Sequence, residues 1–287
     1  MARTLETYQL VERSIITKYR KVLWNPFIEA VKRYEMIQPG DRIAVCISGG
    51  KDSMLLAKLM QQLQKHSDFP FELVFLVMDP GYNELNCQKI ESNAALLNIP
   101  VTIFESDIFE VADSAGKSPC YLCARMRRGY LYSRAQELGC SKIALGHHFN
   151  DVVETTLISM FYGSQLQAML PKLHSTNFEG MTLIRPLYCV HEDDIIAWAR
   201  DNDLEFIQCA CRLTERSAAD TGDVNVSKRK EIKLLLRRLR QGNPNIEKSI
   251  FNSIHAVALD TMPGFKTGGV EHSFLERFNA MESTEDE

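Results

Sequence analysis

Short apolar runs alternate with longer helical patterns through the middle of this chain. Five runs are rich in β-prone residues, and we predict strands at 43–47, 71–78, 101–105, 142–145 and 181–184. Residues 54–64 and 84–98, which lie between the first three runs, have the composition of helices. Strands that alternate with helices of this length form βαβ units. The pattern therefore predicts an α/β fold with a doubly wound, mostly parallel five-stranded sheet.

Further helical patterns flank this core. Residues 1–40 keep apolar side chains at helical spacing and end at Pro39-Gly40, and residues 228–240 read as a basic amphipathic helix. We therefore expect three parts: an N-terminal helical segment at 1–40, a core domain at 41–200, and a helical C-terminal extension with an acidic tail at 201–287.

Composition and charge indicate in which compartment the protein works and which partners it binds. No apolar run reaches the length of about 18 residues that a membrane span needs, and the N-terminus has no apolar signal-peptide core, so we expect a cytoplasmic protein without a membrane partner. In that compartment eight cysteines are better explained as core residues and metal ligands than as disulfides. The net charge is −4, yet 120–134 has four arginines and no acid, and 226–240 has seven basic residues and one Glu. Both stretches are candidate phosphate-backbone surfaces, or simply solvated helix faces.

A glycine-rich turn joins the first predicted strand to the first core helix. It consists of Ser48, Gly49, Gly50, Lys51, Asp52 and Ser53. The two glycines let the backbone turn tightly and bring its N–H groups close to an anion, and the helix N-terminus adds partial positive charge. The spacing is not that of Walker A, whose glycines are separated by four residues. We predict a phosphate-binding turn, the alternative being a ligand-free turn.

Two other polar turns follow predicted strands. Asp79 opens the first, and the second is Gly146-His147-His148, followed by Asp151 and Glu154 at a helix start. In an open parallel sheet, ligands bind beyond the carboxyl ends of the strands, where the strand order reverses. We expect these turns to meet the phosphate-binding turn there, although a helix cap with surface histidines would also explain the second turn.

Cysteines form a second candidate constellation. Cys120 and Cys123 make a C-x-x-C, which brings two sulfurs within reach of one metal or of each other. Cys209 and Cys211 supply later thiols, and either could reach a cluster. Three thiolates around a [4Fe–4S] cluster leave one iron open to another ligand. The alternative is that these cysteines are small buried hydrophobes.

These motifs together resemble one family. The glycine-rich turn resembles the Ser-Gly-Gly-x-Asp-Ser motif of the PP-loop ATP pyrophosphatases. With it, in order, come the C-x-x-C and arginines of 120–128, the Gly-His-His segment of 146–155, Phe161-Tyr162-Gly163, Pro171-Lys172-Leu173, Arg185-Pro186-Leu187 and a later cysteine. The combination looks like the tRNA 2-thiocytidine biosynthesis family, a cluster-dependent branch of the tRNA thiolases, over residues 30–212.

The resemblance implies a PP-loop ATP-binding fold at 41–200 and an enzyme that adenylates the C2 oxygen of an anticodon-loop cytidine and replaces it with sulfur. Its cofactors would be ATP, Mg²⁺ and a [4Fe–4S] cluster, and its partners tRNA, a sulfur donor such as a cysteine desulfurase, and a second copy in a homodimer. By this resemblance Ser48–Ser53 would hold the phosphates and Asp52 would contact Mg²⁺. Cys120, Cys123 and Cys209 would hold the cluster, with Asp52, Cys120 and Cys123 catalytic. Asp79 and His147 would line the adenosine pocket.

The sequence leaves the third cluster ligand and the substrate open. Asn150 stands where related proteins commonly have an acid, and Cys209 and Cys211 compete for the third ligand position. The substrate could therefore be another tRNA base or a small molecule, as in PP-loop ligases and amidases. The alternative to an enzyme is a non-catalytic protein that binds nucleotides or RNA.

Overall fold

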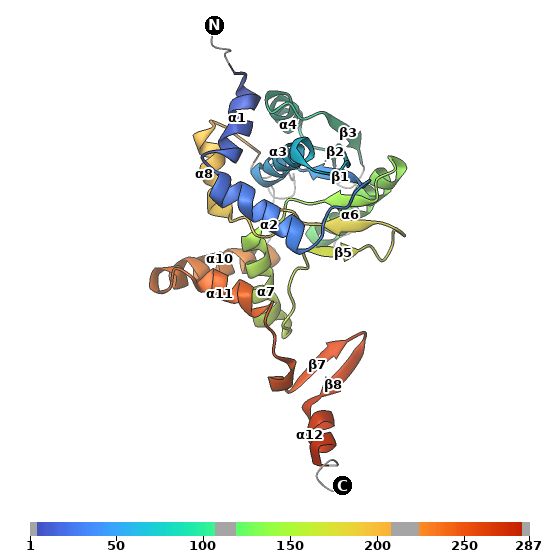
Figure 1. Ribbon diagram of the computed structural model, residues 1–287, viewed down its shortest axis with the longest axis vertical. Helices are drawn as coiled ribbons and strands as arrows, with labels where there is room; N and C mark the ends of the chain where they lie inside the picture. Colours follow the sequence, from blue (N-terminus) through green and yellow to red (C-terminus); the bar gives the residue numbers. More distant parts are fainter. Residues whose placement is uncertain (1–4, 107–118, 208–223, 283–287) are drawn as a thin grey trace. The chain divides into compact units, whose positions relative to one another are not determined.

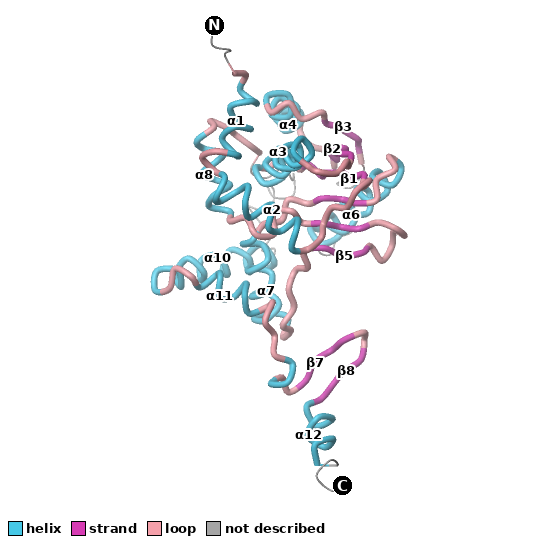
Figure 2. The backbone as a smooth tube through the Cα atoms, in the orientation of Figure 1, coloured by secondary structure: helices cyan, strands magenta, loops and turns pink. Residues whose placement is uncertain are grey.

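The computed structural model describes residues 5–106, 119–207 and 224–282, and elements carry the labels of Figure 1. The chain divides into two compact units, Met1–Leu235 and Leu236–Glu287. Figure 2 separates the helices and strands along the same trace. In the described part no helix has both the length and the apolarity to cross a membrane.

The first unit is built on one six-stranded sheet with the order β3-β2-β1-β4-β6-β5. Five strands are parallel, and β5 pairs antiparallel with β6 at the edge. The strands are β1 (Arg42–Ile47), β2 (Glu72–Asp79), β3 (Val101–Glu105), β4 (Lys142–Ala144), β5 (Lys172–His174) and β6 (Thr182–Ile184). The α/β, mostly parallel prediction is confirmed, but the predicted count of five was one short. The missed strand β5 has only one apolar residue, Leu173, and therefore shows no apolar run.

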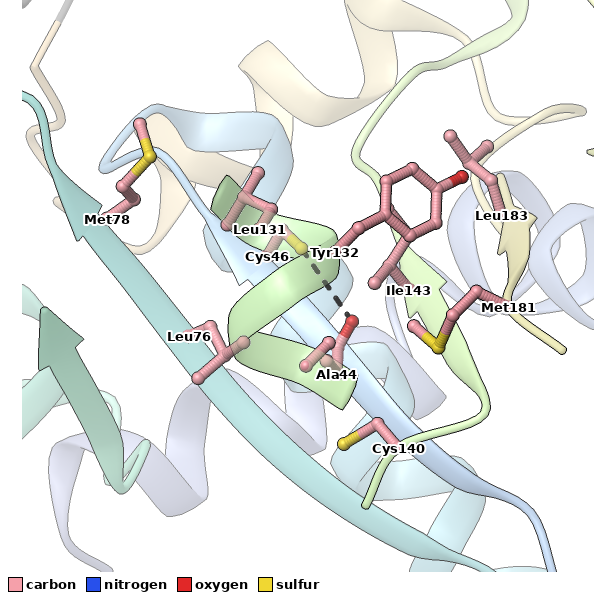
Figure 3. Packing of buried hydrophobic residues seen from close by; sticks show 11 residues of the cluster. Ala44, Cys46, Leu76, Met78, Leu131, Tyr132, Cys140, Ile143, Met181 and Leu183 are labelled. Carbon is pink, nitrogen blue, oxygen red and sulfur yellow. Dashed lines mark hydrogen bonds between the residues drawn. The ribbon is translucent and has the colours of Figure 1, made fainter. Parts of the chain in front are cut away.

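Helices cover both faces of this sheet (Figure 1). They are α3 (Lys51–His66), α4 (Glu84–Leu96), α6 (Pro119–Glu137), α7 (Phe149–Gly163) and α8 (Glu192–Asp201). Side chains alternate along β1, and Ala44 and Cys46 face α6, where Leu131 and Tyr132 pack on them (Figure 3). Ile43 and Val45, on the other face, are fully buried. Burial on both faces explains why β1 reads as a continuous apolar run.

The predicted N-terminal helices form α1 (Thr7–Ile16), a π-helical turn η1 (Arg20–Trp24) and α2 (Asn25–Arg33). One buried cation ties them to the core: Lys58 of α3 donates hydrogen bonds to Glu12 Oε1 at 2.8 Å and to the Leu97 carbonyl at 2.7 Å. A fully buried lysine is tolerated only with such partners. The N-terminal segment is therefore attached to the helix that starts at the glycine-rich turn.

The basic helix predicted at 228–240 is α10 (Val224–Gly242), which begins in the first unit and continues into the second. The second unit also contains α11 (Ile246–Ser253), the 3₁₀ turn η2 (Leu259–Thr261), strands β7 (Gly264–Thr267) and β8 (Val270–Ser273), and α12 (Phe274–Glu282). Gly268 and Gly269 have φ of +58° and +82° and form the hairpin turn between β7 and β8. The sequence pattern did not predict this hairpin.

Candidate functional site

The glycine-rich turn lies at the point where the strand order reverses. Its strand β1 has β2 on one side and β4 on the other, and the chain moves outward from β1 in both directions. The turn therefore opens onto the crevice beyond the carboxyl ends of β1 and β4, where open α/β sheets bind their ligands. Among the residues described, none accepts a hydrogen bond from the backbone N–H groups of residues 49–52. These donors at the start of α3 are suited to phosphate oxygens.

Two features fix the shape of this turn. Gly49 has φ of +82°, and a Cβ there would lie 2.6 Å from side-chain carbons of both Ile90 and Ile207. Only glycine fits this position without displacing its neighbours. The buried Ser53 hydroxyl closes the turn from inside, since it accepts from Ser48 N at 3.1 Å and donates to the Gly50 carbonyl at 2.9 Å. Ser53 thus stabilises the loop that carries the backbone N–H groups of residues 49–52.

The lysine of the turn lies between two carboxylates. Lys51 Nζ is 3.1 Å from Asp52 Oδ1 and 3.1 Å from Glu192 Oε1 at the start of α8. Burial alone would lower the pKa of Lys51, but these two carboxylates outweigh it and raise the pKa. Lys51 is therefore a firmly protonated cation beside the backbone N–H groups of the turn, where it can neutralise phosphate charge.

The β4–α7 turn packs directly on the glycine-rich turn. A Cβ on Gly146 would lie 3.1 Å from Ser53 N, so any larger residue would push the two turns apart by a few tenths of an ångström. The buried His148 that follows has its Nε2 3.6 Å from Asp151 Oδ2 and 3.9 Å from Asp52 Oδ1. The predicted meeting of the two turns is thus observed in the structure.

Helix α10 supplies two more cations to this region. Arg229 lies 2.8 Å from Asp151 Oδ1 and 3.4 Å from Glu154 Oε2, and Lys233 lies 3.0 Å from Glu192 Oε2. Burial raises the pKa of Glu154 to about 7 although both cations act to lower it. Burial would also raise the pKa of Glu192, but Lys51 and Lys233 outweigh it and lower the pKa. Carboxylates and cations therefore alternate from the glycine-rich turn to α10.

Asn150 has a structural explanation. Its side chain is buried, and its Oδ1 accepts a hydrogen bond from the backbone N–H of Glu192 at 2.9 Å. The amide thus caps the first turn of α8 and positions Glu192 toward Lys51. A neutral side chain here also avoids adding a negative charge to a region that already holds four carboxylates, those of Asp52, Asp151, Glu154 and Glu192.

The predicted adenosine-pocket residues lie at the same edge of the sheet, at the ends of β2 and β4. Asp79 Oδ1 accepts from the backbone N–H groups of Gly81 and Tyr82 at 2.8 and 2.7 Å, so this carboxylate orders its own turn. Burial lowers the pKa of His147 to about 4, and its Nδ1 has no hydrogen-bond partner among the described residues. A neutral imidazole with an unsatisfied nitrogen is suited to a ligand, and the assignment of both residues to adenosine stays a prediction.

The structure describes only part of the segments that contain the predicted cluster cysteines. Cys120 and Cys123 lie in the first turn of α6, while their side chains, and all of Cys209 and Cys211, lie outside the described residues. Described residues on either side of 208–223 lie at the site, because Ile207 packs on Gly49 and Arg229 of α10 pairs with Asp151. Elsewhere, Cys46 and Cys140 are buried core residues, as expected. In the part of the chain that is described, no three His, Cys, Asp or Glu side chains are arranged to hold a metal ion.

Three residues of this site were not predicted from the sequence: Glu192, Arg229 and Lys233. Glu192 was visible only as one of three acids that favour the start of a helix, and the two cations only as part of a basic helix. Their separation from Lys51 by more than 140 residues explains the omission, since a single sequence carries no signal for such distant pairs.

Comparison with known proteins places this fold and site in a family. Residues 17–214 match the model of the PP-loop domain. A tRNA-cytidine(32) 2-sulfurtransferase of Geobacter sulfurreducens is 37% identical over 240 residues, which cover 83% of this chain and 90% of the relative. One from Neisseria meningitidis serogroup C is 42% identical over 198 residues, 67% of this chain and 61% of the relative.

A solved structure shares the fold. The U34-tRNA thiolase of Methanococcus maripaludis, solved with its [4Fe–4S] cluster, superposes with a TM-score of 0.62 at 20% identity and covers 81% of this chain and 78% of its own. The chain therefore belongs to the PP-loop family and, within it, to the family of the tRNA-cytidine(32) 2-sulfurtransferases.

Proposed function

We propose that this protein is an ATP-dependent tRNA sulfurtransferase that replaces the C2 oxygen of an anticodon-loop cytidine with sulfur. The observation that carries the proposal is the identity of 37% to a tRNA-cytidine(32) 2-sulfurtransferase, over an alignment that covers 90% of that relative. The geometry supports it, because Lys51 and the N–H groups of residues 49–52, which have no partner among the described residues, lie at the switch point of the sheet.

The first chemical step is adenylation. The C2 oxygen of the cytidine attacks the α-phosphorus of ATP, a new O–P bond forms, and pyrophosphate leaves with the electrons of the broken P–O bond. Negative charge grows on the departing pyrophosphate, and the N–H groups of residues 49–52 together with the Lys51 ammonium would stabilise it there. The carbonyl oxygen, a poor leaving group, thereby becomes part of a phosphate ester.

The second step exchanges oxygen for sulfur. A sulfur nucleophile attacks C2, and the C–O bond breaks so that AMP leaves with the former base oxygen. Mg²⁺ would bind at Asp52, the carboxylate in the first turn of α3, and neutralise phosphate charge. A [4Fe–4S] cluster held by Cys120, Cys123 and Cys209 would supply the sulfur when bound. Cys211 remains the alternative third ligand.

The wider setting follows from this chemistry. The sulfur has to come from a donor such as a cysteine desulfurase, and tRNA and ATP are cytoplasmic substrates, so we expect the protein to act there. Arg127 and Arg128, on α6 after the C-x-x-C, would contact the backbone of the anticodon strand. We also expect a homodimer.

The adenylation site can be tested by the release of AMP and pyrophosphate in the presence of unmodified tRNA transcript. Lys51→Met is expected to reduce the rate by about 100- to 1,000-fold, the usual loss for one preorganised group that stabilises developing charge. Asp52→Asn is expected to fail similarly at physiological Mg²⁺. The matched control, Asp68→Asn, removes an exposed carboxylate beyond the end of α3 and should match the wild type. Full activity of Lys51→Met would contradict the assignment.

The cluster can be tested separately by iron and sulfide analysis after anaerobic purification. The wild type is expected to contain about four irons and four sulfides per chain, as a [4Fe–4S] cluster requires. Cys120→Ala and Cys123→Ala should lose them, whereas the control Cys189→Ala, a cysteine outside the C-x-x-C, should not. Comparing Cys209→Ala with Cys211→Ala would identify the third ligand. An iron-free but fully active protein would refute the cluster.

A further inference from the structure

A group of exposed apolar side chains lies at the C-terminal end of α7 and in the loop that follows it. Phe161 and Tyr162 are 55% and 39% exposed, and every residue from 160 to 167 is exposed. We call the group the α7 platform; it consists of Met160, Phe161, Tyr162, Leu166 and Leu170. Exposed apolar patches of this kind on a folded chain mark interaction sites.

Hydrogen bonds from Arg185 and Tyr188 hold the loop that carries part of the platform. Tyr188 donates a hydrogen bond to the Met169 carbonyl at 2.9 Å, the backbone N–H of Arg185 donates to the Pro171 carbonyl at 3.0 Å, and the buried Arg185 guanidinium donates to the Leu170 carbonyl. The Arg-Pro-Leu motif therefore anchors the loop after Phe-Tyr-Gly. The part of the loop that carries Leu170 is thus ordered without a partner, which lowers the entropic cost of binding there.

A cation adjoins the aromatic side chains. Lys228 Nζ lies 4.8 Å from the centroid of the Tyr162 ring. Five residues later on α10, Lys233 lies 3.7 Å from Glu154, near the opposite end of α7. The two helices are thus antiparallel neighbours, and α10 leads from the platform to the nucleotide site.

The spacing between platform and site suits a short single strand. Phe161 lies seven positions after Glu154 on α7, which corresponds to about 10 Å along a helix axis. Stacked nucleotides rise by roughly 3.4 Å each, so about three of them span this distance. A base that enters the nucleotide site would leave its neighbours within reach of the platform.

We propose that the α7 platform is a stacking surface for unpaired nucleotides of RNA that adjoin the modified base. This inference deepens the proposed function and rests on it. Unpaired bases are bound by stacking on aromatic side chains, and a nearby lysine serves their phosphates. A second copy of the chain fits less well. Five half-exposed side chains offer on the order of 400 Å², whereas a stable interface needs about 800 Å² from each partner.

The test measures the dissociation constant of unmodified tRNA transcript by fluorescence anisotropy with the full-length protein. Phe161→Ala combined with Tyr162→Ala is expected to weaken tRNA binding by roughly 5- to 100-fold, the usual range for the loss of base stacking. Phe161→Trp combined with Tyr162→Phe should keep the wild-type affinity, whereas leucine at both positions should not. The matched control, Leu96→Ala, removes a comparably exposed apolar side chain of α4. ATP affinity should stay unchanged in all of these variants.

Several results would overturn the inference. If the double alanine variant binds tRNA as the wild type does while the wild type thiolates tRNA, the platform is wrong and the proposed function stands. If the wild type neither binds nor thiolates tRNA, both fail. If the double leucine variant binds tRNA with wild-type affinity, the platform contacts RNA by simple apolar contact and not by stacking. A wild-type dimer that the alanine pair dissociates in sedimentation, with tRNA affinity unchanged, would assign the platform to a second copy.

Discussion

Substituting Glu154 tests the electrostatics of the site with a calculable magnitude. This carboxyl is 3% exposed and lies 3.4 Å from Arg229 and 3.7 Å from Lys233, yet burial raises its pKa from 4.5 to about 7. The folded state therefore holds a proton that the unfolded state has lost between these values, so stability falls as the pH rises from 4.5 through 7. This raised pKa corresponds to ~3 kcal/mol, most of which develops between pH 5 and pH 8.

Glu154→Gln removes this titration and keeps the shape of the side chain. The free energy of unfolding of the variant, relative to the wild type, should rise by roughly 2–3 kcal/mol from pH 5 to pH 8. Urea denaturation followed by tryptophan fluorescence measures it, because both tryptophans, Trp24 and Trp198, belong to the unit that contains the site. Glu91→Gln, which removes an exposed carboxylate of α4, controls for the loss of one charge. Parallel curves for Glu154→Gln and the wild type would refute the reasoning.

Three further substitutions probe the supports of the site and the platform. Gly146→Ala places a Cβ about 3.1 Å from backbone atoms and should lower stability by about 1–3 kcal/mol and weaken ATP binding; unchanged ATP affinity would contradict the close packing. Asn150→Ala removes the cap on Glu192 N and should lower the urea midpoint by the equivalent of about 1 kcal/mol and raise KM for ATP. A higher midpoint together with a lower KM would disprove the positioning role. Arg185→Met frees the Leu170 carbonyl and should weaken tRNA binding without affecting ATP binding, and equal losses of both would count against a specific role.

Much of the fold could be predicted because the parallel strands are buried on both faces. In β1 every residue after Arg42 is buried, so the strand appears in the sequence as an uninterrupted apolar run ending at the glycine-rich turn. The edge strand β5 and the hairpin β7–β8 lack such runs, because they are short and none of their residues is buried. Their pairing depends on neighbouring strands and on turn glycines, which period-based patterns do not detect.

Some residues of the site could likewise be predicted from the sequence, and others could not. Lys51 and Asp52 could be assigned because the motif is local, and the structure explains its glycines by φ and by close approach. The distant partner of Lys51 could not be assigned, because Glu192 follows it by 141 residues and by several strands and helices. The role of Asn150 was equally hidden, since its partner is a backbone N–H on a helix that begins 42 residues later.

The most direct test of the central claim is the nucleoside composition of tRNA after an anaerobic reaction with ATP, Mg²⁺, a sulfide source and the reconstituted protein. Mass spectrometry of the digested tRNA should find one 2-thiocytidine in the anticodon loop, formed with one AMP and one pyrophosphate, and neither product with Lys51→Met. Formation of AMP and pyrophosphate without sulfur in the tRNA, or thiolation that continues without ATP, would contradict the claim.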